Sequence, residues 1–172
     1  TPLVRSEAFT ELAGCEVFLK LENLQRAGAF KIRGALNRLL AMPPSERARG
    51  VVTASAGNHG QGVAFAARHV GVPACVVLPL GVPLAKLTAI QRTGAEVVIT
   101  GADYDAAHAA ALAIANERGA TYVHAFDDPD VIAGQGTVAL EMLDERPDLD
   151  AIVVPVGGGG LIAGTVLAVA DL

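Results

Sequence analysis

The sequence lacks the features that are typical of secreted, nucleic-acid-binding and membrane-spanning proteins. Its two cysteines, Cys15 and Cys75, form no metal-binding or redox motif, and no signal-peptide pattern is visible, so we expect a reduced, cytoplasmic protein. It has 13 lysines and arginines against 18 aspartates and glutamates, a net charge of −5 and no basic tract, which argues against nucleic-acid binding. The longest apolar stretch, 151–172, is broken by Pro155 and four glycines, so we expect no membrane-spanning helix.

What the chain does have is apolar residues in short runs. Hydrophobic residues make up 52% of its 172 positions, which is enough for a substantial core in one domain or two small lobes. Short apolar segments alternate with longer amphipathic ones. We predict strands at 17–21, 51–54, 74–78, 96–100, 121–124 and 151–156, and helices at 31–40, 60–70, 84–93, 104–118, 131–143 and 161–170.

Residues that begin and end helices support this reading. Gly71, Gly94 and Gly119 each follow a helical stretch, where glycine can adopt the left-handed conformation. Asp103 is a predicted N-cap, and Pro83 suits a first helical turn. Because the strands are apolar throughout and joined by helices, the pattern predicts an α/β protein with a parallel sheet covered on both faces.

One lysine differs from the other two, Lys20 and Lys86. Lys31, within 29–35 (AFKIRGA), begins an amphipathic helix directly after Phe30, and small residues follow it. A lysine that forms a Schiff base needs a lowered pKa, which a partly desolvated site provides. A lysine at a helix start is more often simply solvated, so the hypothesis depends on what accompanies it.

Two glycine-rich loops accompany it, Ser55–Gly60 (SAGNHG) and Gly157–Gly160 (GGGG). Each lies between a predicted strand and a predicted helix, where backbone N–H groups and a positive helix end can receive an anion. We predict that the second loop binds a phosphate and the first a substrate carboxylate. The lysine and both loops together indicate an aldehyde cofactor with a phosphate tail. A tight turn, or a dinucleotide loop fitting the loose pattern G-x-G-x-x-A, remains an alternative for the second loop.

Other polar residues and small residues have weaker interpretations. His59 could cap a helix or lie near the substrate, and capping is favoured. His69, His108 and His124 show no ligand spacing, and we predict structural or solvated roles and no metal site. The segment 131–137 (VIAGQGT) suggests either close packing near the cofactor or a helix packed on the sheet through small residues.

Taken together, these segments resemble the fold type II (tryptophan synthase β-like) pyridoxal-phosphate enzymes, most closely the threonine dehydratase and serine racemase branch. The resemblance covers essentially the whole chain. It implies a two-lobed α/β fold with parallel sheets in three layers and helices on both faces. Lys31 matches the Schiff-base and catalytic lysine, Phe30 the residue against the pyridine ring, and Asn58 the contact to the ring oxygen. The matched positions are, for pyridoxal 5′-phosphate, Phe30, Lys31, Asn58, Gly157, Gly158, Gly159, Gly160 and Leu161, and, for the substrate, Ser55, Ala56, Gly57, Asn58 and His59.

Two details narrow the resemblance to one group within the branch, and one position departs from the family. The pair Asn58-His59 looks like the dehydratases, whereas cysteine synthases typically have Asn-Thr. Ala56 stands where racemases carry a serine that acts as the base on the second face, which favours elimination over racemisation. Ala29 departs from the family's usual serine.

The resemblance implies a threonine/serine ammonia-lyase that converts L-threonine, and also L-serine, to the 2-oxoacid and ammonia by β-elimination. It further implies amino-acid metabolism, such as isoleucine biosynthesis, and a homodimer or homotetramer at full length. Serine racemase and hydroxyaspartate dehydratase are the alternatives of the same fold. A non-catalytic, small-molecule-binding α/β module is the alternative of another class.

The resemblance also predicts two lobes. Residues 50–127 would form a small mobile lobe, and residues 1–49 and 128–172 part of a large cofactor-binding lobe, with 42–45 and 127–130 as candidate boundaries. The chain starts without methionine and stops inside an apolar helical pattern. We therefore expect an N-terminal fragment, with the group facing the pyridine nitrogen and the cation site supplied from beyond residue 172.

Overall fold

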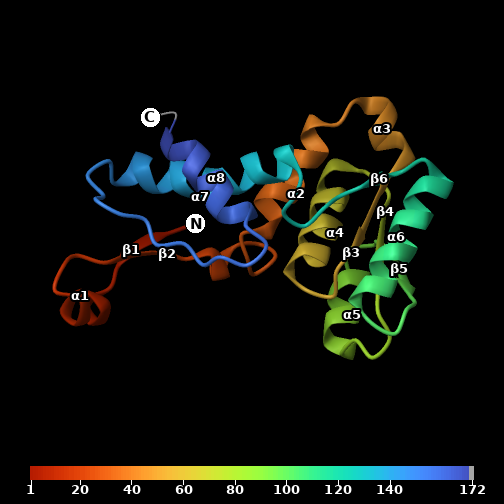
Figure 1. The fold of residues 1–172 in the computed structure, drawn as a ribbon, viewed down its shortest axis with the longest axis horizontal. Coiled ribbons are helices and arrows are strands. Elements are labelled where there is room, and N and C mark those ends of the chain that lie inside the picture. Colours follow the sequence, from red (N-terminus) through yellow and green to blue (C-terminus); the bar gives the residue numbers. More distant parts are fainter. Residues whose placement is uncertain (171–172) are drawn as a thin grey trace.

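The computed structural model describes residues 1–170, and these form two groups of elements (Figure 1). The first group is built on a parallel four-stranded sheet with the order β5-β4-β3-β6. Its strands are β3 (Val51–Ala54), β4 (Ala74–Leu78), β5 (Glu96–Ile99) and β6 (Thr121–Tyr122). The second group has an antiparallel pair, β1 (Leu3–Arg5) and β2 (Phe18–Lys20), with helices α1 (Glu7–Ala13), α7 (Pro129–Glu145) and α8 (Gly160–Ala170). Helix α2 (Lys31–Ala41) lies where the two groups meet.

Helices cover both faces of the parallel sheet. On one face, Val51 and Val76 pack against α4 (Asn58–Val70), and α5 (Leu84–Gln91) adds Ile90 to the same side. On the other face, Val52 and Val77 pack against alanines of α6 (Tyr104–Arg118). Successive side chains of a strand point to opposite faces, so a strand covered on both sides needs a side chain at every position that is apolar or, like Thr53, hydrogen-bonded. The prediction of a parallel sheet covered on both faces is confirmed for these strands.

Most of the residues predicted to begin or end helices do so in the structure. Asp103 caps α6, its carboxylate accepting a hydrogen bond from the N–H of Ala106 at 2.9 Å. Gly71 and Gly119 end α4 and α6 with φ of 75° and 60°, as predicted. Gly94 has positive φ but lies beyond the end of α5, and Pro83 precedes α5 as its N-cap instead of lying in its first turn.

Glycines allow α7 to lie against both α2 and α8. A Cβ on Gly134 would be 2.6 Å from the Arg33 carbonyl oxygen of α2, and one on Gly136 would be 2.6 Å from the Gly164 carbonyl oxygen of α8. Real Cβ atoms do not approach backbone this closely, so these positions require glycine. Gly134 and Gly136 therefore serve packing between helices, and the alternative that this segment packs on the sheet through its small residues is wrong.

Two predicted strands differ from expectation. The segment 151–156 forms no strand, because no strand within residues 1–170 pairs with it, and Val153 is 96% exposed. A strand exists only where its N–H and C=O groups meet a partner, and an apolar run does not provide one. The strand predicted at 17–21 does form, as β2, but it pairs antiparallel with β1 and does not join the parallel sheet.

Four short elements were not predicted: β1, α1, a 3₁₀ turn at Glu22–Leu24, and α3 (Pro44–Arg49). None of them contains a buried residue, so none leaves an apolar periodicity in the sequence. Helix α3 begins at Pro44, within the segment proposed as a lobe boundary. Proline suits the first helical turn, where its missing N–H costs nothing.

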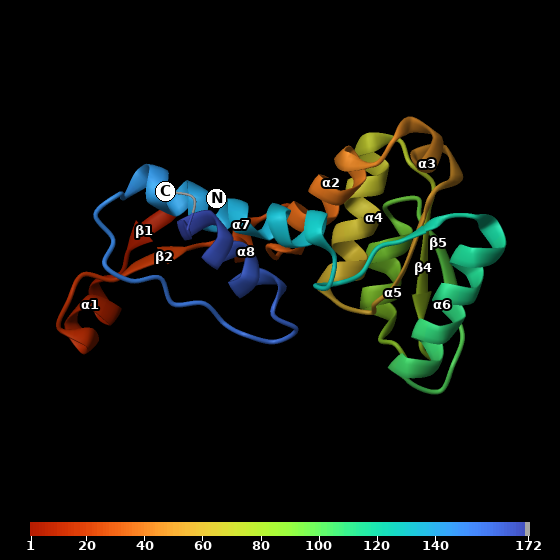
Figure 2. The ribbon, with the colours of Figure 1, turned by 45° about the horizontal axis from the view of Figure 1, so that its top comes forward.

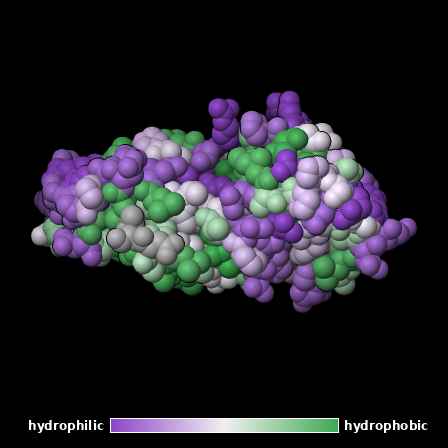
Figure 3. Space-filling view, turned by 90° about the horizontal axis from the view of Figure 1, so that it is seen from above, coloured by the Kyte–Doolittle hydropathy of each residue, from purple (hydrophilic) through white to green (hydrophobic). Residues whose placement is uncertain are grey.

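Apolar side chains are exposed on the second group of elements. Figure 3 shows this surface on the half of the molecule that carries α7 and α8, where Leu140, Val166, Leu167 and Val169 are 45% to 57% exposed. These helices bury their glycine faces against each other and turn larger side chains outward. Across residues 1–170, no helix is both long enough and apolar enough to span a membrane.

Candidate active site

Lys31 begins α2, with Phe30 as the residue before the helix. Its side chain is half-buried, and Nζ donates a hydrogen bond to the Ala125 carbonyl oxygen at 2.7 Å. Nζ also lies 5.3 Å from the centre of the Phe30 ring. Burial lowers the pKa of Lys31 below its usual value, because desolvation disfavours the charged amine. The geometry thus supplies a primary amine that deprotonates more easily than a solvated lysine.

The loop Ser55–Gly60 connects β3 to α4 beside this lysine. A Cβ on Gly62, in the first turns of α4, would be 3.1 Å from backbone atoms of Lys31 and Ile32, so the start of α4 lies against the start of α2. The Ser55 hydroxyl accepts a hydrogen bond from the N–H of Gly57 at 3.1 Å, which shapes the turn. A Cβ on Gly60 would be 3.2 Å from both the Ser55 carbonyl carbon and Val76, so the loop closes tightly at that glycine.

His59 ties this loop to the segment after β6. It is buried, and its Nε2 lies 3.0 Å from the Val123 carbonyl oxygen. A carbonyl can only accept, so Nε2 carries the proton. The pKa of His59 is lowered to about 4, mainly because burial disfavours the charged ring. The hydrogen bond to Val123 opposes this shift, and the positive charge of nearby Lys31 contributes to it. The N-cap of α4 is Gly57, so the helix-capping role expected for His59 is wrong.

The tetraglycine loop, Gly157–Gly160, leads into α8. It does not follow a strand as predicted, since 151–156 pairs with no strand in the described part of the chain, residues 1–170. Gly159 has φ of +89°, a conformation that favours glycine, and a Cβ at Gly157 or Gly159 would meet no atom within 4 Å. Leu161, half-buried, lies in the first turn of α8.

Phe126 brings the tetraglycine loop and Lys31 to the same segment of chain. A Cβ on Gly158 would be 2.5 Å from ring atoms of Phe126, and one on Gly160 would be 3.0 Å from its Cα. The neighbouring residue, Ala125, accepts the hydrogen bond from Lys31. The three predicted segments therefore converge on the coil between β6 and α7, which Figure 2 shows running between the two groups of elements. Asn58 is exposed at the start of α4, and its predicted contact to a ring oxygen stays a prediction.

The electrostatics of the two loops suit an anion. Helices α4 and α8 have no acidic residue in the first turn. In contrast, α6 and α7 are capped by Asp103 and Asp128 and carry a further aspartate in the first turn. The positive ends of α4 and α8 are therefore left for an external negative group. Within residues 1–170, no three His, Cys, Asp or Glu side chains are grouped so that they could hold a metal ion.

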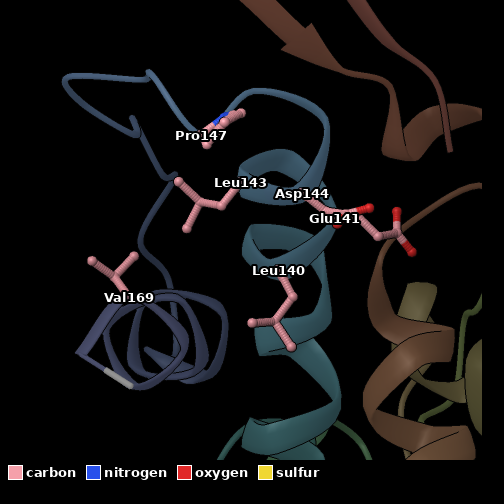
Figure 4. A pocket seen from close by; sticks show the side chains of 6 residues that line it. All are labelled: Leu140, Glu141, Leu143, Asp144, Pro147 and Val169. Carbon is pink, nitrogen blue, oxygen red and sulfur yellow. The ribbon is translucent and has the colours of Figure 1, made fainter. Parts of the chain in front are cut away.

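The hollow between α7 and α8 lies outside this site. Figure 4 shows its lining side chains, Leu140, Glu141, Leu143, Asp144, Pro147 and Val169, and none belongs to the predicted site. Glu141 is turned toward α2, where it pairs with Arg33.

Sequence reasoning missed the coil 123–127 as part of the site. Its contribution comes from the carbonyl oxygens of Val123 and Ala125 and from the Phe126 ring. Backbone carbonyls leave no trace in a sequence. His124 was visible, but its contacts depend on how the chain turns after β6.

Comparison with known proteins decides the family. A family model described as pyridoxal-phosphate dependent enzyme matches residues 1–172. The chain belongs to the family of pyridoxal-phosphate dependent enzymes. An L-threonine ammonia-lyase of Thermotoga maritima is 51% identical over 172 residues, which are 100% of this chain and 43% of that protein. A serine racemase of Oryza sativa subsp. japonica is 42% identical over 168 residues, covering 98% of this chain and 50% of the racemase.

A solved structure agrees with the fold of this pyridoxal-phosphate dependent enzyme. The processed form of threonine deaminase isoform 2 from Solanum lycopersicum matches with a TM-score of 0.96 at 40% identity, covering 99% of this chain and 50% of that one. The chain thus has the type II α/β fold of these enzymes, and it spans about half the length of the curated relatives it matches.

The residues of the site fit the family's cofactor, pyridoxal 5′-phosphate. An aldehyde needs a primary amine of lowered pKa, which Lys31 supplies. A phosphate needs backbone donors at a helix start with room beside them, and Gly157 and Gly159 border open space before α8. The family match replaces the dinucleotide interpretation of the tetraglycine loop.

Proposed function

We propose that Lys31 holds pyridoxal 5′-phosphate and that the full-length protein is a threonine/serine ammonia-lyase. It would convert L-threonine to 2-oxobutyrate and ammonia, and L-serine to pyruvate and ammonia. The observation that carries the proposal is a half-buried lysine of lowered pKa, held beside two glycine-led helix starts. The T. maritima relative is an L-threonine ammonia-lyase and the tomato relative a threonine deaminase, which supports the choice of substrate.

The steps of this β-elimination would be carried out by the cofactor and by residues of the chain. Bound cofactor supplies the electron sink for the carbanion formed at the substrate's Cα. Lys31 Nζ, once free of the cofactor, accepts the Cα proton, and the low pKa caused by burial keeps this amine available as a base. The substrate's β-hydroxyl would then leave as water, taking the proton that Lys31 Nζ had accepted from Cα. Water finally hydrolyses the released imine to the 2-oxoacid and ammonia.

The remaining site residues are assigned by their position around Lys31. We assign Gly157–Gly160 and Leu161 to the phosphate, Phe30 to the pyridine ring and Asn58 to its ring oxygen. Ser55–His59 would bind the substrate carboxylate at the start of α4, which no acidic side chain occupies. The Phe30 ring beside Nζ supports its assignment.

The proposal extends to the lobes and the assembly. Residues 50–127, which contain the whole parallel sheet, would form the small mobile lobe, and 1–49 with 128–172 would form part of the large lobe. We expect a cytoplasmic homodimer or homotetramer that functions in amino-acid metabolism and binds neither nucleic acid nor membrane. The net charge of −5 supports the exclusion of nucleic acid.

The first test identifies the lysine. The full-length, cofactor-loaded protein is treated with borohydride, which fixes the cofactor to the amine that holds it, and the labelled peptide is mapped. We expect the label on Lys31. A label on Lys20, which is tied to Glu141 and Glu145, or on Lys86 would contradict the assignment.

The second test concerns the reaction and depends on Ala56. Racemisation requires a proton donor opposite Lys31, and the Ala56 methyl group packs partly buried against the apolar cluster beneath α4 and α5 and carries no exchangeable proton. Chiral chromatography and oxoacid detection with L-serine should therefore find pyruvate and little D-serine. Ala56→Ser should raise the racemised fraction. Faster formation of D-serine than pyruvate by the unmodified protein would establish the racemase alternative, and absence of both products would favour the binding module.

A further inference from the structure

The coil of residues 123–127, here called the β6–α7 strap, is held at two carbonyl oxygens. That of Val123 accepts hydrogen bonds from the Thr53 hydroxyl and from His59 Nε2, each at 3.0 Å. That of Ala125 accepts the bond from Lys31 at 2.7 Å. The strap is therefore fixed to the sheet at one point and to the lysine two residues later.

His124 organises the strap between and beyond these points. Its Nδ1 accepts hydrogen bonds from the N–H groups of Phe126, at 3.3 Å, and Asp127, at 2.8 Å. A nitrogen that accepts two backbone N–H groups carries no proton of its own, so Nδ1 acts here purely as an acceptor. The Asp128 carboxylate accepts from the N–H groups two and three residues ahead in the same manner. His124 thus performs the task of a capping side chain within an irregular segment.

Phe126 transmits this arrangement to the tetraglycine loop. Its ring meets the His124 ring edge-on, with centroids 4.6 Å apart and an interplanar angle of 83°. It also lies where a Cβ of Gly158 would be, and its backbone limits the space at Gly160. Gly157 and Gly159, by contrast, border open space. Two of the four glycines are therefore required by Phe126, and the other two remain free to face a ligand.

We propose that His124 is a positioning residue for the tetraglycine loop, acting through Phe126. The inference rests on the proposed function of that loop in holding the cofactor's phosphate. His124 holds the backbone N–H groups of residues 126 and 127, and this holds the Phe126 ring in place. The ring in turn determines where the backbone of Gly158 and Gly160 lies as the loop enters α8. Loss of the Nδ1 acceptor would leave the loop without a fixed support.

The test compares two replacements of His124 in the full-length protein. His124→Phe keeps a ring against Phe126 but removes the acceptor, whereas His124→Asn keeps a short acceptor for the N–H groups at 126 and 127 but removes the ring. His108→Asn is the matched control, since His108 belongs to the same aromatic cluster, 6.4 Å from the His124 ring. Two quantities are measured: amide hydrogen exchange of residues 157–161 in the cofactor-free protein, and the dissociation constant of pyridoxal 5′-phosphate by equilibrium titration.

We expect His124→Phe to speed loop exchange at least tenfold and weaken cofactor binding about tenfold, with the melting temperature little changed. His124→Asn should stay within about threefold of the parent in both, as should His108→Asn. Unchanged loop exchange in His124→Phe overturns the proposal. Faster exchange with unchanged affinity supports the positioning role but contradicts the phosphate role of the loop, so the two failures are distinguishable. An equal loss in His124→Asn and His124→Phe would also overturn it, because the acceptor would then be irrelevant.

A second pair of variants applies if His124→Phe does not fold. Phe126 is 36% exposed, so Phe126→Ala should fold, and it should speed loop exchange without touching the bonds of His124. Gly158→Ala should be poorly tolerated in the parent and well tolerated with Phe126→Ala, because the added methyl group would occupy the place of the ring. Equal effects of Gly158→Ala in both backgrounds would contradict the contact on which the proposal depends.

Discussion

At the scale of single residues, the four glycines of the tetraglycine loop serve two different purposes. The sequence suggests that the glycines of 157–160 let backbone approach a phosphate. The structure adds that Gly158 and Gly160 accommodate Phe126, whereas Gly157 and Gly159 face open space. A substitution at Gly158 would therefore report on packing before it reports on phosphate binding. Gly157 and Gly159 are the positions at which a ligand contact can be examined without that clash, although Gly159 also needs its positive φ.

His59 gives a residue-scale prediction on pH. Its folded-state pKa of about 4 lies below the ordinary 6.5, so the unfolded chain binds the proton more tightly. Its contribution to stability is complete above pH 6.5, falls as the pH drops toward 4 and is then lost, amounting to about 3 kcal/mol. His59→Gln can still donate to the Val123 carbonyl but does not titrate. Urea unfolding of the full-length protein should show a shallower fall between pH 6.5 and 4 for this variant.

The control for His59 is His69→Gln, at an exposed position in the last turn of α4. It should follow the pH dependence of the parent. If His59→Gln and the parent lose stability in parallel, the neutral, buried state of His59 is not the cause of the fall.

At the scale of elements, α7 is the helix on which the second group is assembled. It contacts α2 on one side through Gly34 and Gly134, and α8 on the other through Gly136 and Gly164. Because Lys31 opens α2 and the tetraglycine loop opens α8, α7 fixes the two cofactor-binding starts relative to each other. Helices can approach this closely only where side chains are absent from the contact.

Gly164→Ala tests this arrangement. The added methyl group would meet the Ile132 carbonyl oxygen and lie 2.6 Å from the Gly136 nitrogen, and backbone atoms cannot move aside as a side chain can. We expect the free energy of unfolding of the full-length protein to fall by about 2 kcal/mol or more, as overpacking costs elsewhere. Gly157→Ala, where a Cβ meets nothing within 4 Å, should change it by less than about 0.5 kcal/mol. Similar losses in both variants would contradict the close α7–α8 contact.

At the scale of the whole molecule, an ion-pair network joins the N-terminal strands to α2 and α7. Arg33 contacts both oxygens of Glu22, at 2.8 and 2.9 Å, and both of Glu141, at 2.6 and 2.8 Å. Lys20 reaches Glu141 and Glu145 at 2.9 Å each. The hydrogen bond from Arg33 is the main reason that the pKa of Glu141 falls to about 2. The network thus fixes α2 only two residues after Lys31.

Arg33→Lys should weaken this connection while keeping the charge. Lysine cannot form two bidentate pairs, and the Arg33 side chain is only 8% exposed, so unmet carboxylate oxygens would remain partly buried. We expect a loss of about 1 to 3 kcal/mol in the unfolding free energy of the full-length protein. Arg118→Lys, in the exposed bidentate pair with Glu96, should produce no measurable change. Equal losses would show that burial of the network is unimportant.

The amino-acid sequence by itself determined most of the helices and strands and which residues are available for the chemistry of the site. Strands 51–54 and 74–78 and helix 104–118 have the predicted bounds. Continuous apolar runs and an N-cap such as Asp103 are local signals, which act on residues only a few positions away in the sequence. Lys31 and the glycine loops were found for the same reason, since a scarce lysine and closely spaced glycines are visible in short segments without a fold. The resemblance that these segments carried led to the family that the comparison confirmed.

Only the tertiary structure decided which elements pair and which residues meet. Among residues 1–170 the run 151–156 has no partner strand, and β2 pairs antiparallel with β1, because hydrogen-bond partners lie far away in the sequence. His59 bonds to Val123 and Lys31 to Ala125 across 64 and 94 positions, through backbone carbonyls that every residue possesses. The tetraglycine loop likewise acquired its relation to Phe126 from the path of the chain, because packing depends on shape in three dimensions and not on the identity of neighbours in the sequence.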